Sequence, residues 1–263
     1  MRQLLTLSAV LAMAVTSLPS RAQTFAAMVS PPRFELEGRP GETVRAVFEL
    51  TNRANAPSEY LLRTADWSLS SDFNVNFADG LAPGSCRPWV ALERPSALLP
   101  AGGTIHYRFE VAVPAAAPAG ECRFAILIEG KEPSIAKAGE LSMPMTGRIG
   151  LIVYVNVGAA APQLELAGNH IVKVGGRDLP TLIMRNTGSV HGRVSGFLTG
   201  TDANGVKYDF NPSDFPILPG TSGDVYLTPS TSTDDHPTLS FPVRVQGTLE
   251  WGKSRLKIDE QFR

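Results

Sequence analysis

The chain has 263 residues, of which 24 are Lys or Arg, 25 are Asp or Glu, and 43% are hydrophobic. This near-neutral charge argues against nucleic-acid binding, which depends largely on an excess of basic side chains. The length suits one large domain or two ordinary ones.

Residues 1–22 are predicted to be a cleaved signal peptide. Arg2 supplies a positive start, and residues 4–15 are almost all apolar. Ser20-Arg21-Ala22 places small residues at the two positions that signal peptidase reads. The apolar run is shorter than the roughly 20 residues that a membrane-spanning helix needs. We therefore expect an exported mature chain that starts near Gln23 and does not span a membrane.

The rest of the chain has the pattern of an all-β protein. Short runs rich in Val, Leu, Phe and Tyr are separated by Gly, Pro, Asn and Asp, at intervals typical of a β-sandwich. The 21 prolines leave little room for long helices. We predict two immunoglobulin-like β-sandwich domains, at residues 23–157 and 163–263, joined by a Gly/Ala/Pro linker at residues 158–162.

Strands of the first domain are predicted from apolar runs and from alternation with period two, which turns one face of a strand inward. They cover residues 33–36, 43–50, 60–67, 73–77, 104–113 and 122–129. The last of these is apolar on both faces, which indicates a central strand.

A polar segment at residues 131–140 is predicted to be a loop. After it, Leu141, Met143 and Met145 alternate with other residues and would share one face of an extended segment. If this segment is an exposed edge strand, it could add itself to a partner's sheet. The other interpretation is that the three side chains face the core of their own domain.

Strands of the second domain are predicted at residues 182–186, 192–201, 224–227, 243–251 and 257–262. The turn at residues 202–205 ends in Asn204-Gly205, a dipeptide that favours the turn types found in β-hairpins.

Cys86 and Cys122 are the only two cysteines. In an exported protein they are predicted to form a disulfide bond. Their 36-residue separation fits neither a redox CxxC motif nor a zinc site.

The sequence gives little sign of catalysis. It has none of the common nucleophile, metalloprotease or nucleotide-binding motifs. Its four histidines are far apart, and Asp234-Asp235-His236 lies in a Ser/Thr-rich loop where acidic residues commonly form turns. We expect no catalytic residues, no metal and no cofactor. The residues Trp67, Trp89 and Trp251 are interpreted as core side chains, with a carbohydrate-binding platform as the alternative.

Several short motifs occur in an order that resembles the periplasmic chaperones of the chaperone–usher pathway of pilus assembly. In chain order, the motifs are Ser30-Pro31-Pro32-Arg33, a strand ending at Asn52, the turn at residues 99–103, the segment 141–154, Met184-Arg185-Asn186-Thr187-Gly188 and Ile217-Leu218-Pro219-Gly220. The resemblance covers nearly all of the mature chain and identifies it as a divergent member.

The resemblance implies a mechanism. Chaperones of this family lend a strand to pilus subunits that lack one, and pass the subunits to an outer-membrane usher. It assigns the donor strand to Leu141, Met143 and Met145. It also implies two basic residues that anchor the subunit's terminal carboxylate. Arg33 matches the first. The second position falls on Gly150, and Arg148, the nearest basic residue, lies two positions earlier on the same strand face and is taken as the second anchor.

The alternative function is a periplasmic or cell-surface binding module, such as an adhesin or a carbohydrate binder. The sequence leaves open whether the free chaperone would dimerise to cover its edge strand.

Overall fold

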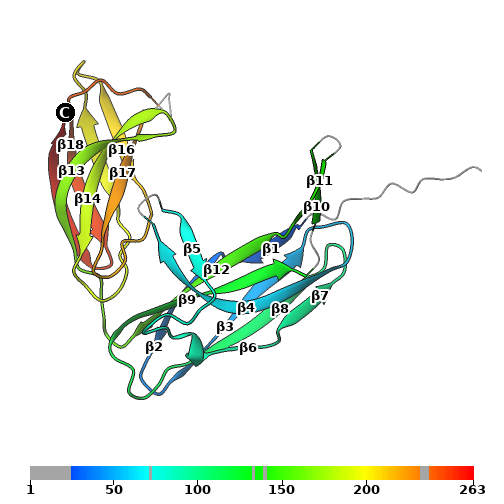
Figure 1. Ribbon diagram of the computed structural model, residues 1–263. Coiled ribbons are helices and arrows are strands. Elements are labelled where there is room, and N and C mark those ends of the chain that lie inside the picture. The colour runs from blue at the N-terminus through cyan, green and yellow to red at the C-terminus, as the bar shows by residue number, and fades with distance from the viewer. Residues whose placement is uncertain (1–24, 71–72, 132–133, 139–140, 232–236) are drawn as a thin grey trace, which may run out of the picture.

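The computed structural model describes residues 25–70, 73–131, 134–138, 141–231 and 237–263, and the side chains of residues 134–144 are not among the described features. The predicted signal peptide therefore lies outside the described residues. No described segment forms a helix long and apolar enough to cross a membrane. Nearly all regular structure is β, as predicted, and the strands form two sandwiches (Figure 1).

The first sandwich packs two sheets against each other. One has the strand order β1 (Ala27–Ser30), β3 (Thr43–Asn52), β8 (Thr104–Ala112) and β6 (Val90–Leu92). The other has the order β2 (Arg33–Gly38), β12 (Arg148–Val157), β9 (Gly120–Gly130), β4 (Ser58–Leu69) and β5 (Val75–Ala78), and β7 (Ser96–Leu99) also pairs with β4. A short 3₁₀ helix covers Arg87–Trp89.

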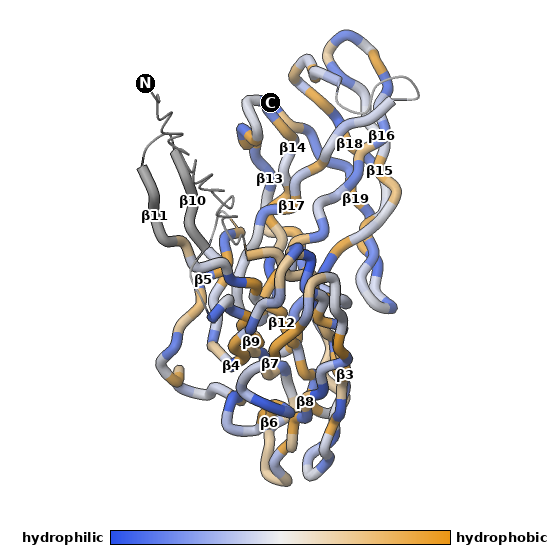
Figure 2. The backbone as a smooth tube through the Cα atoms, turned by 90° about the vertical axis from the view of Figure 1, so that its right-hand side faces the viewer, coloured by the Kyte–Doolittle hydropathy of each residue, from blue (hydrophilic) through white to orange (hydrophobic). Residues whose placement is uncertain are grey.

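Alternation along the strands builds the first core. Phe48 and Leu50 of β3 meet Phe124 and Ile126 of β9, and all four side chains are at most 1% exposed. Burying a large apolar side chain contributes roughly 1.5–3 kcal/mol. In Figure 2 the apolar positions gather where β4, β9 and β12 cross the middle of this sandwich.

The disulfide bond predicted from the sequence is present. It joins Cys86, just before the 3₁₀ helix, to Cys122 in β9, with the two Cα atoms 6.0 Å apart. That separation lies in the usual range for a disulfide bond. The bond ties the long connection between β5 and β6 to the central strand of the second sheet.

The segment at residues 131–140 differs from the prediction. Instead of a loop throughout, it contains β10 (Ser134–Ala138), which pairs with β11 (Leu141–Met145) as an antiparallel hairpin. The sequence favoured a loop because the stretch that could form a strand, Ser134–Ala138, is only five residues long and is flanked by Gly, Pro and charged residues. The hairpin extends beyond the main sheets (Figure 1).

The second sandwich contains seven strands. Their order is β13 (Leu164–Val174), β14 (Arg177–Asn186), β17 (Ser222–Ser230), β16 (Lys207–Pro212), β15 (Ser195–Thr201), β18 (Val243–Trp251) and β19 (Ser254–Phe262). The first half of β17 pairs with β14 and its second half with β16, so β17 links the two layers. The predicted hairpin turn at residues 202–205 connects β15 to β16, and Gly205 has a φ of 79°.

Candidate partner-binding edge and inter-sandwich cleft

The β12 strand is covered by different lengths of neighbouring strand on its two sides. On one side β9 pairs with it over its whole length, from Arg148 to Val157. On the other side β2 pairs with it only from Ile152 onward. Within the described part of the chain, residues 148–151 have no strand on this second side. An unpaired strand edge presents backbone donors and acceptors that another chain can use.

The β10–β11 hairpin continues this edge. In its register, Leu141 lies opposite Ala138, Met143 opposite Ala136, and Met145 opposite Ser134. No other described strand pairs with β11. The three predicted donor residues Leu141, Met143 and Met145 are therefore in an edge strand, and the side chains of Leu141 and Met143 lie outside the described features.

The predicted donor positions are separated from the core-facing residues of β12 by multiples of two residues, the repeat of a β-strand. Leu151 and Val153 are fully buried in the first core, and Ile149 packs against it half-buried. Counting back by twos from Ile149 leads to Met145, whose side chain is 56% exposed. The apolar face of β12 thus extends in sequence beyond the end of its own sandwich.

Arg33, the first predicted anchor, lies in the cleft between the sandwiches. It sits opposite Ile152 in the parallel pairing of β2 with β12. Its Nε donates to Oε1 of Glu35 at 3.1 Å, and its Nη1 is 3.7 Å from Oδ2 of Asp214 in the second sandwich. The Arg33 side chain is 44% exposed, so solvent reaches it.

Arg148, the second predicted anchor, is not brought next to Arg33. It lies four residues before Ile152 on β12, about 13 Å along the strand at about 3.3 Å per residue. Its Nη1 is 3.3 Å from Oε1 of Glu129, and its guanidinium lies 5.5 Å from the centre of the Phe77 ring. The Arg148 guanidinium therefore already has a carboxylate and an aromatic partner.

Phe77 explains why position 150 is a glycine. A Cβ atom added to Gly150 would lie 2.1 Å from Cζ of Phe77, far inside contact distance. Phe77 comes from β5 and packs with Trp67, Leu127 and Tyr154 in a third apolar cluster, on the cleft face of the sheet. The position where the resemblance places a basic residue is thus closed by a phenyl ring.

Arg193 is a cleft residue that the sequence analysis did not single out. Its Nε is 3.8 Å from Oε1 of Glu35, and its Nη1 is 3.8 Å from Oδ2 of Asp214. The same two carboxylate oxygens are the partners of Arg33. The Arg193 side chain is 18% exposed, and its buried Nε has no hydrogen-bond acceptor in the described structure. Two guanidiniums from different sandwiches therefore share two carboxylates.

A groove opens beside this charge network. It has a volume of about 340 Å³, and both arginines line it together with mostly apolar side chains, among them Ile152, Val75 and Phe215. The Asp214 side chain is 63% exposed and its carboxylate makes long ion pairs, so the carboxylate holds the guanidiniums only weakly, although the backbone carbonyl of Asp214 accepts a short hydrogen bond from Nη1 of Arg193. A carboxylate entering the groove could take the place of the Asp214 carboxylate.

A buried pair of side chains joins the sandwiches close to the linker. The side chain of Glu121 in β9 is fully buried. Its carboxylate accepts a hydrogen bond from the backbone N–H of His191 at 2.8 Å and makes a second, very short contact with Nδ1 of His191. The His191 ring stacks on Tyr154, with the ring centres 3.9 Å apart. Burial raises the pKa of the Tyr154 phenol, so this ring is neutral.

The described residues contain no group of His, Cys, Asp and Glu side chains suited to hold a metal ion. The Asp234-Asp235-His236 segment lies outside the described residues. Trp67 and Trp251 are buried, as interpreted from the sequence, and Trp89 packs partly buried against the first core. The most exposed large aromatic side chain among the described residues is Phe197, at 95%.

Comparisons with known proteins give matches only at the level of structure. No protein-family model matches the chain, and no curated protein sequence does. A structure described as the chaperone–tip adhesin complex of CFA/I fimbriae aligns over 89% of this chain and 98% of its own, at 14% identity and a TM-score of 0.47.

This chain is similar in fold to fimbrial chaperones. The CsuC–CsuE chaperone–tip adhesion subunit complex of Acinetobacter baumannii aligns over 90% of this chain and 99% of its own, at 12% identity and a TM-score of 0.45. The complex of SafA pilin with the SafB chaperone of Salmonella enterica aligns over 90% of this chain and 98% of its own, also at 12% identity and a TM-score of 0.45.

Proposed function

We propose that this protein is a periplasmic, non-catalytic chaperone that binds pilus subunits by adding a strand to them and delivers them to an outer-membrane usher. The observation that carries the proposal is the open edge formed by β11 and the first half of β12. Backbone groups of Arg148–Leu151 are available to a partner strand, and Leu141, Met143 and Met145 continue in sequence the alternation of the core-facing residues of β12.

The flexible side chain of methionine suits this role, because it adapts to pockets of different shape. An isolated hairpin with an apolar face would also be prone to aggregate unless a partner covers it. Both considerations favour a partner that supplies a groove for alternate apolar side chains.

We further propose that the cleft holds an anionic group of the bound subunit, such as its terminal carboxylate. Arg33 remains the first anchor. Arg148 stays a predicted second anchor, but Arg193 is better placed, since it shares Glu35 and Asp214 with Arg33. Charge-assisted hydrogen bonds from two guanidiniums would make such an anchor strong and directional.

Co-expression with a small, β-rich secreted subunit that aggregates alone tests the proposal. Changing Met143→Asp together with Met145→Asp should abolish the co-purified complex, because each carboxylate would have to be buried in the subunit's apolar groove. Leu98→Asp is the matched control, because Leu98 is 71% exposed on β7 and lies outside the proposed edge.

An unchanged yield of soluble subunit with the double variant would contradict the proposal. Loss of the complex in the Leu98→Asp control as well would show that added charge, rather than position, is responsible. Thermal unfolding of each free variant separates a binding defect from a folding defect.

A further inference from the structure

The β4–β5 hairpin reaches from the first sandwich to the second. The pairing of β4 with β9 ends at Ala65, but β4 continues to Leu69 and its last four residues pair with β5. Figure 1 shows β5 standing between the two sandwiches. The hairpin is thus an extension of the sheet that carries the open edge.

The turn of this hairpin positions Phe73. The backbone N–H and the hydroxyl of Ser70 both donate to the Asn74 carbonyl at 3.0 Å, and the Phe73 N–H donates to the Ser70 carbonyl at 3.0 Å. Phe73 has a φ of 61°, and it is the only described residue other than glycine with a positive φ. A bulky residue in the left-handed region is strained, so the surrounding contacts must hold it there.

Those contacts come from the second sandwich. The Phe73 ring stacks on Phe215, with the ring centres 4.0 Å apart and the planes at 17°, and it meets Tyr226 edge-on at 5.6 Å. Two hydrogen bonds tie the segment that carries Phe215 to β17. The backbone N–H of Ser213 donates to the Tyr226 carbonyl at 2.9 Å, and Ser213 Oγ accepts from the Tyr226 N–H at 3.0 Å.

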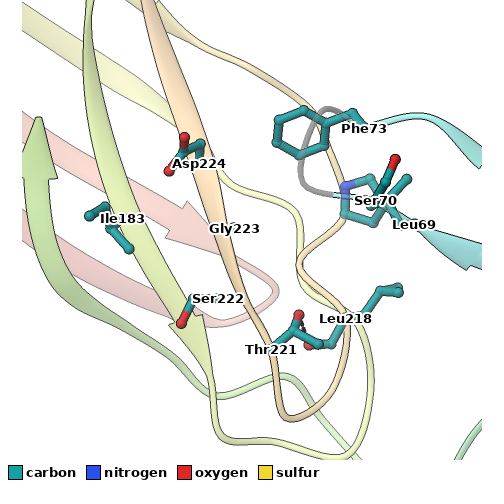
Figure 3. A pocket seen from close by; sticks show the side chains of 10 residues that line it. Leu69, Ser70, Phe73, Ile183, Leu218, Thr221, Ser222, Gly223 and Asp224 are labelled. Atoms are coloured by element: carbon teal, nitrogen blue, oxygen red, sulfur yellow. Dashed lines mark hydrogen bonds between the residues drawn. The ribbon is translucent and has the colours of Figure 1, made fainter. Parts of the chain in front are cut away.

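Open space lies on both sides of the stacked rings. One side is the 340 Å³ cleft groove, and the other is a groove of about 290 Å³ that runs between Leu69 and Phe73 of the hairpin and Ile183, Leu218 and Asp224 of the second sandwich (Figure 3). Phe73 lines both grooves. The tip of the hairpin thus touches the second sandwich through this aromatic contact, while Leu218 of the second sandwich is buried in the third apolar cluster with Trp67 and Tyr154.

We propose that the Phe73–Phe215 stack is a latch that fixes the angle between the two sandwiches and so sets the width of the cleft groove. The contact of Glu121 with His191 and Ser189 near the linker is a joint about which the second sandwich can pivot. Across the cleft, the ion pairs of Arg33 and Arg193 and the buried Leu218 add further contacts, and the stacked rings at the hairpin tip remove the remaining freedom. Release of the latch lets the angle vary without disturbing either core.

The latch is tested in the free protein, so the result does not depend on the proposed function. Spin labels are placed at Leu98 in the first sandwich and Arg255 in the second, both well exposed, through non-canonical amino acids that leave the disulfide bond intact. Pulsed electron paramagnetic resonance then gives the distribution of distances between the labels. Phe73→Ala and Phe215→Ala each remove one ring of the stack, and Phe197→Ala removes an exposed ring of the same sandwich as Phe215.

The narrow distribution of the unmodified protein should be lost in Phe73→Ala and in Phe215→Ala, and kept in Phe197→Ala. The double variant should be no broader than either single variant, because both remove the same contact. An unchanged distribution in either latch variant overturns the proposal, and so does a further broadening in the double variant. Since the two rings belong to different sandwiches, a folding defect in one variant leaves the other as an independent test.

Discussion

One buried asparagine closes a turn in each sandwich. The Asn52 amide group donates to the carbonyls of Ala56, Leu99 and Pro100, and its oxygen accepts from the Ala54 N–H and the Tyr60 hydroxyl. In the second sandwich Asn186 does the same with the carbonyls of Val190 and Ile217 and with the N–H groups of Gln163 and Gly188. Both asparagines are 0% exposed, so the two sandwiches share a structural device that their sequences hardly reveal.

Asn52→Ala should therefore be strongly destabilising. We expect the free energy of unfolding to fall by about 2–4 kcal/mol, because each buried polar group left without a partner costs about 1–3 kcal/mol. Urea denaturation followed by circular dichroism measures the change. Asn76→Ala, at an exposed position of β5, is the control and should shift stability by less than about 0.5 kcal/mol. Equal stability of the two variants would contradict this account of Asn52.

Asp202 makes the second sandwich sensitive to acid. Burial acts to raise the pKa of its carboxyl, but hydrogen bonds from the backbone N–H groups of Val206, Asn204 and Ser240 and from the Tyr208 hydroxyl outweigh burial and hold this pKa below its usual range. The unfolded chain therefore takes up a proton at about pH 3.9, where the folded protein does not yet do so. Stability from this group is present above that pH and is lost as the pH falls toward the lower folded-state pKa.

Asp202→Asn should flatten the loss of stability as the pH falls below about 4. The amide keeps an oxygen that can accept from the backbone but has no charge to lose. Thermal unfolding across this pH range measures the slope, and Asp209→Asn, at an exposed position of β16, should leave it unchanged. The same acid slope in Asp202→Asn and in the unmodified protein would show that Asp202 is not its source.

At the scale of single elements, the β4–β5 hairpin places an aromatic ring at the point of the cleft face where the family resemblance places a basic residue. Phe77 closes the space above Gly150, and the guanidinium of the neighbouring Arg148 lies 5.5 Å from the centre of the Phe77 ring. Sequence reasoning predicted strands over residues 60–67 and 73–77 but not that the second would fold over the sheet. Phe73 is positioned by its contact with Phe215 of the second sandwich, and Phe77 by its contact with Gly150 of β12. Contacts between residues so far apart in the chain cannot be predicted from the local sequence pattern.

Gly150→Lys should destabilise the protein by about 1–3 kcal/mol, as expected for overpacking. The ring of Phe77 would have to leave the apolar cluster to make room. In combination with Phe77→Ala the same lysine should cost less than the sum of the two single changes, because the alanine removes the clash. Denaturant midpoints of the four proteins give this coupling. Strictly additive effects would mean that Phe77 is not what keeps position 150 a glycine.

The strands were predicted best where the alternating or apolar pattern is long. Residues 43–50, 122–129 and 243–251 all lie in strands, and the predicted Asn204-Gly205 turn connects β15 to β16. β10 was missed because its five residues carry a weak pattern between polar flanks. Its partner β11 was recognised as extended, but only the structure gives its pairing.

At the scale of the whole molecule, the cleft is assembled from residues that are far apart in the sequence. Arg33 and Glu35 belong to β2, whereas Arg193 and Asp214 belong to the second sandwich. The resemblance pointed to Arg33 but could not find Arg193, because the meeting of the two arginines depends on how the sandwiches are oriented. The joint at Glu121 and His191 was missed for the same reason.

The central claim is that the edge from Leu141 to Leu151 pairs with a strand of a bound subunit. Hydrogen exchange of the backbone amides, measured on the free protein and on its complex with a co-expressed subunit, tests this claim most directly. We predict that amides in residues 141–151 exchange freely in the unbound protein where they face away from β9 and β10, and become protected in the complex. A stable complex that leaves exchange in residues 141–151 unchanged would contradict the account.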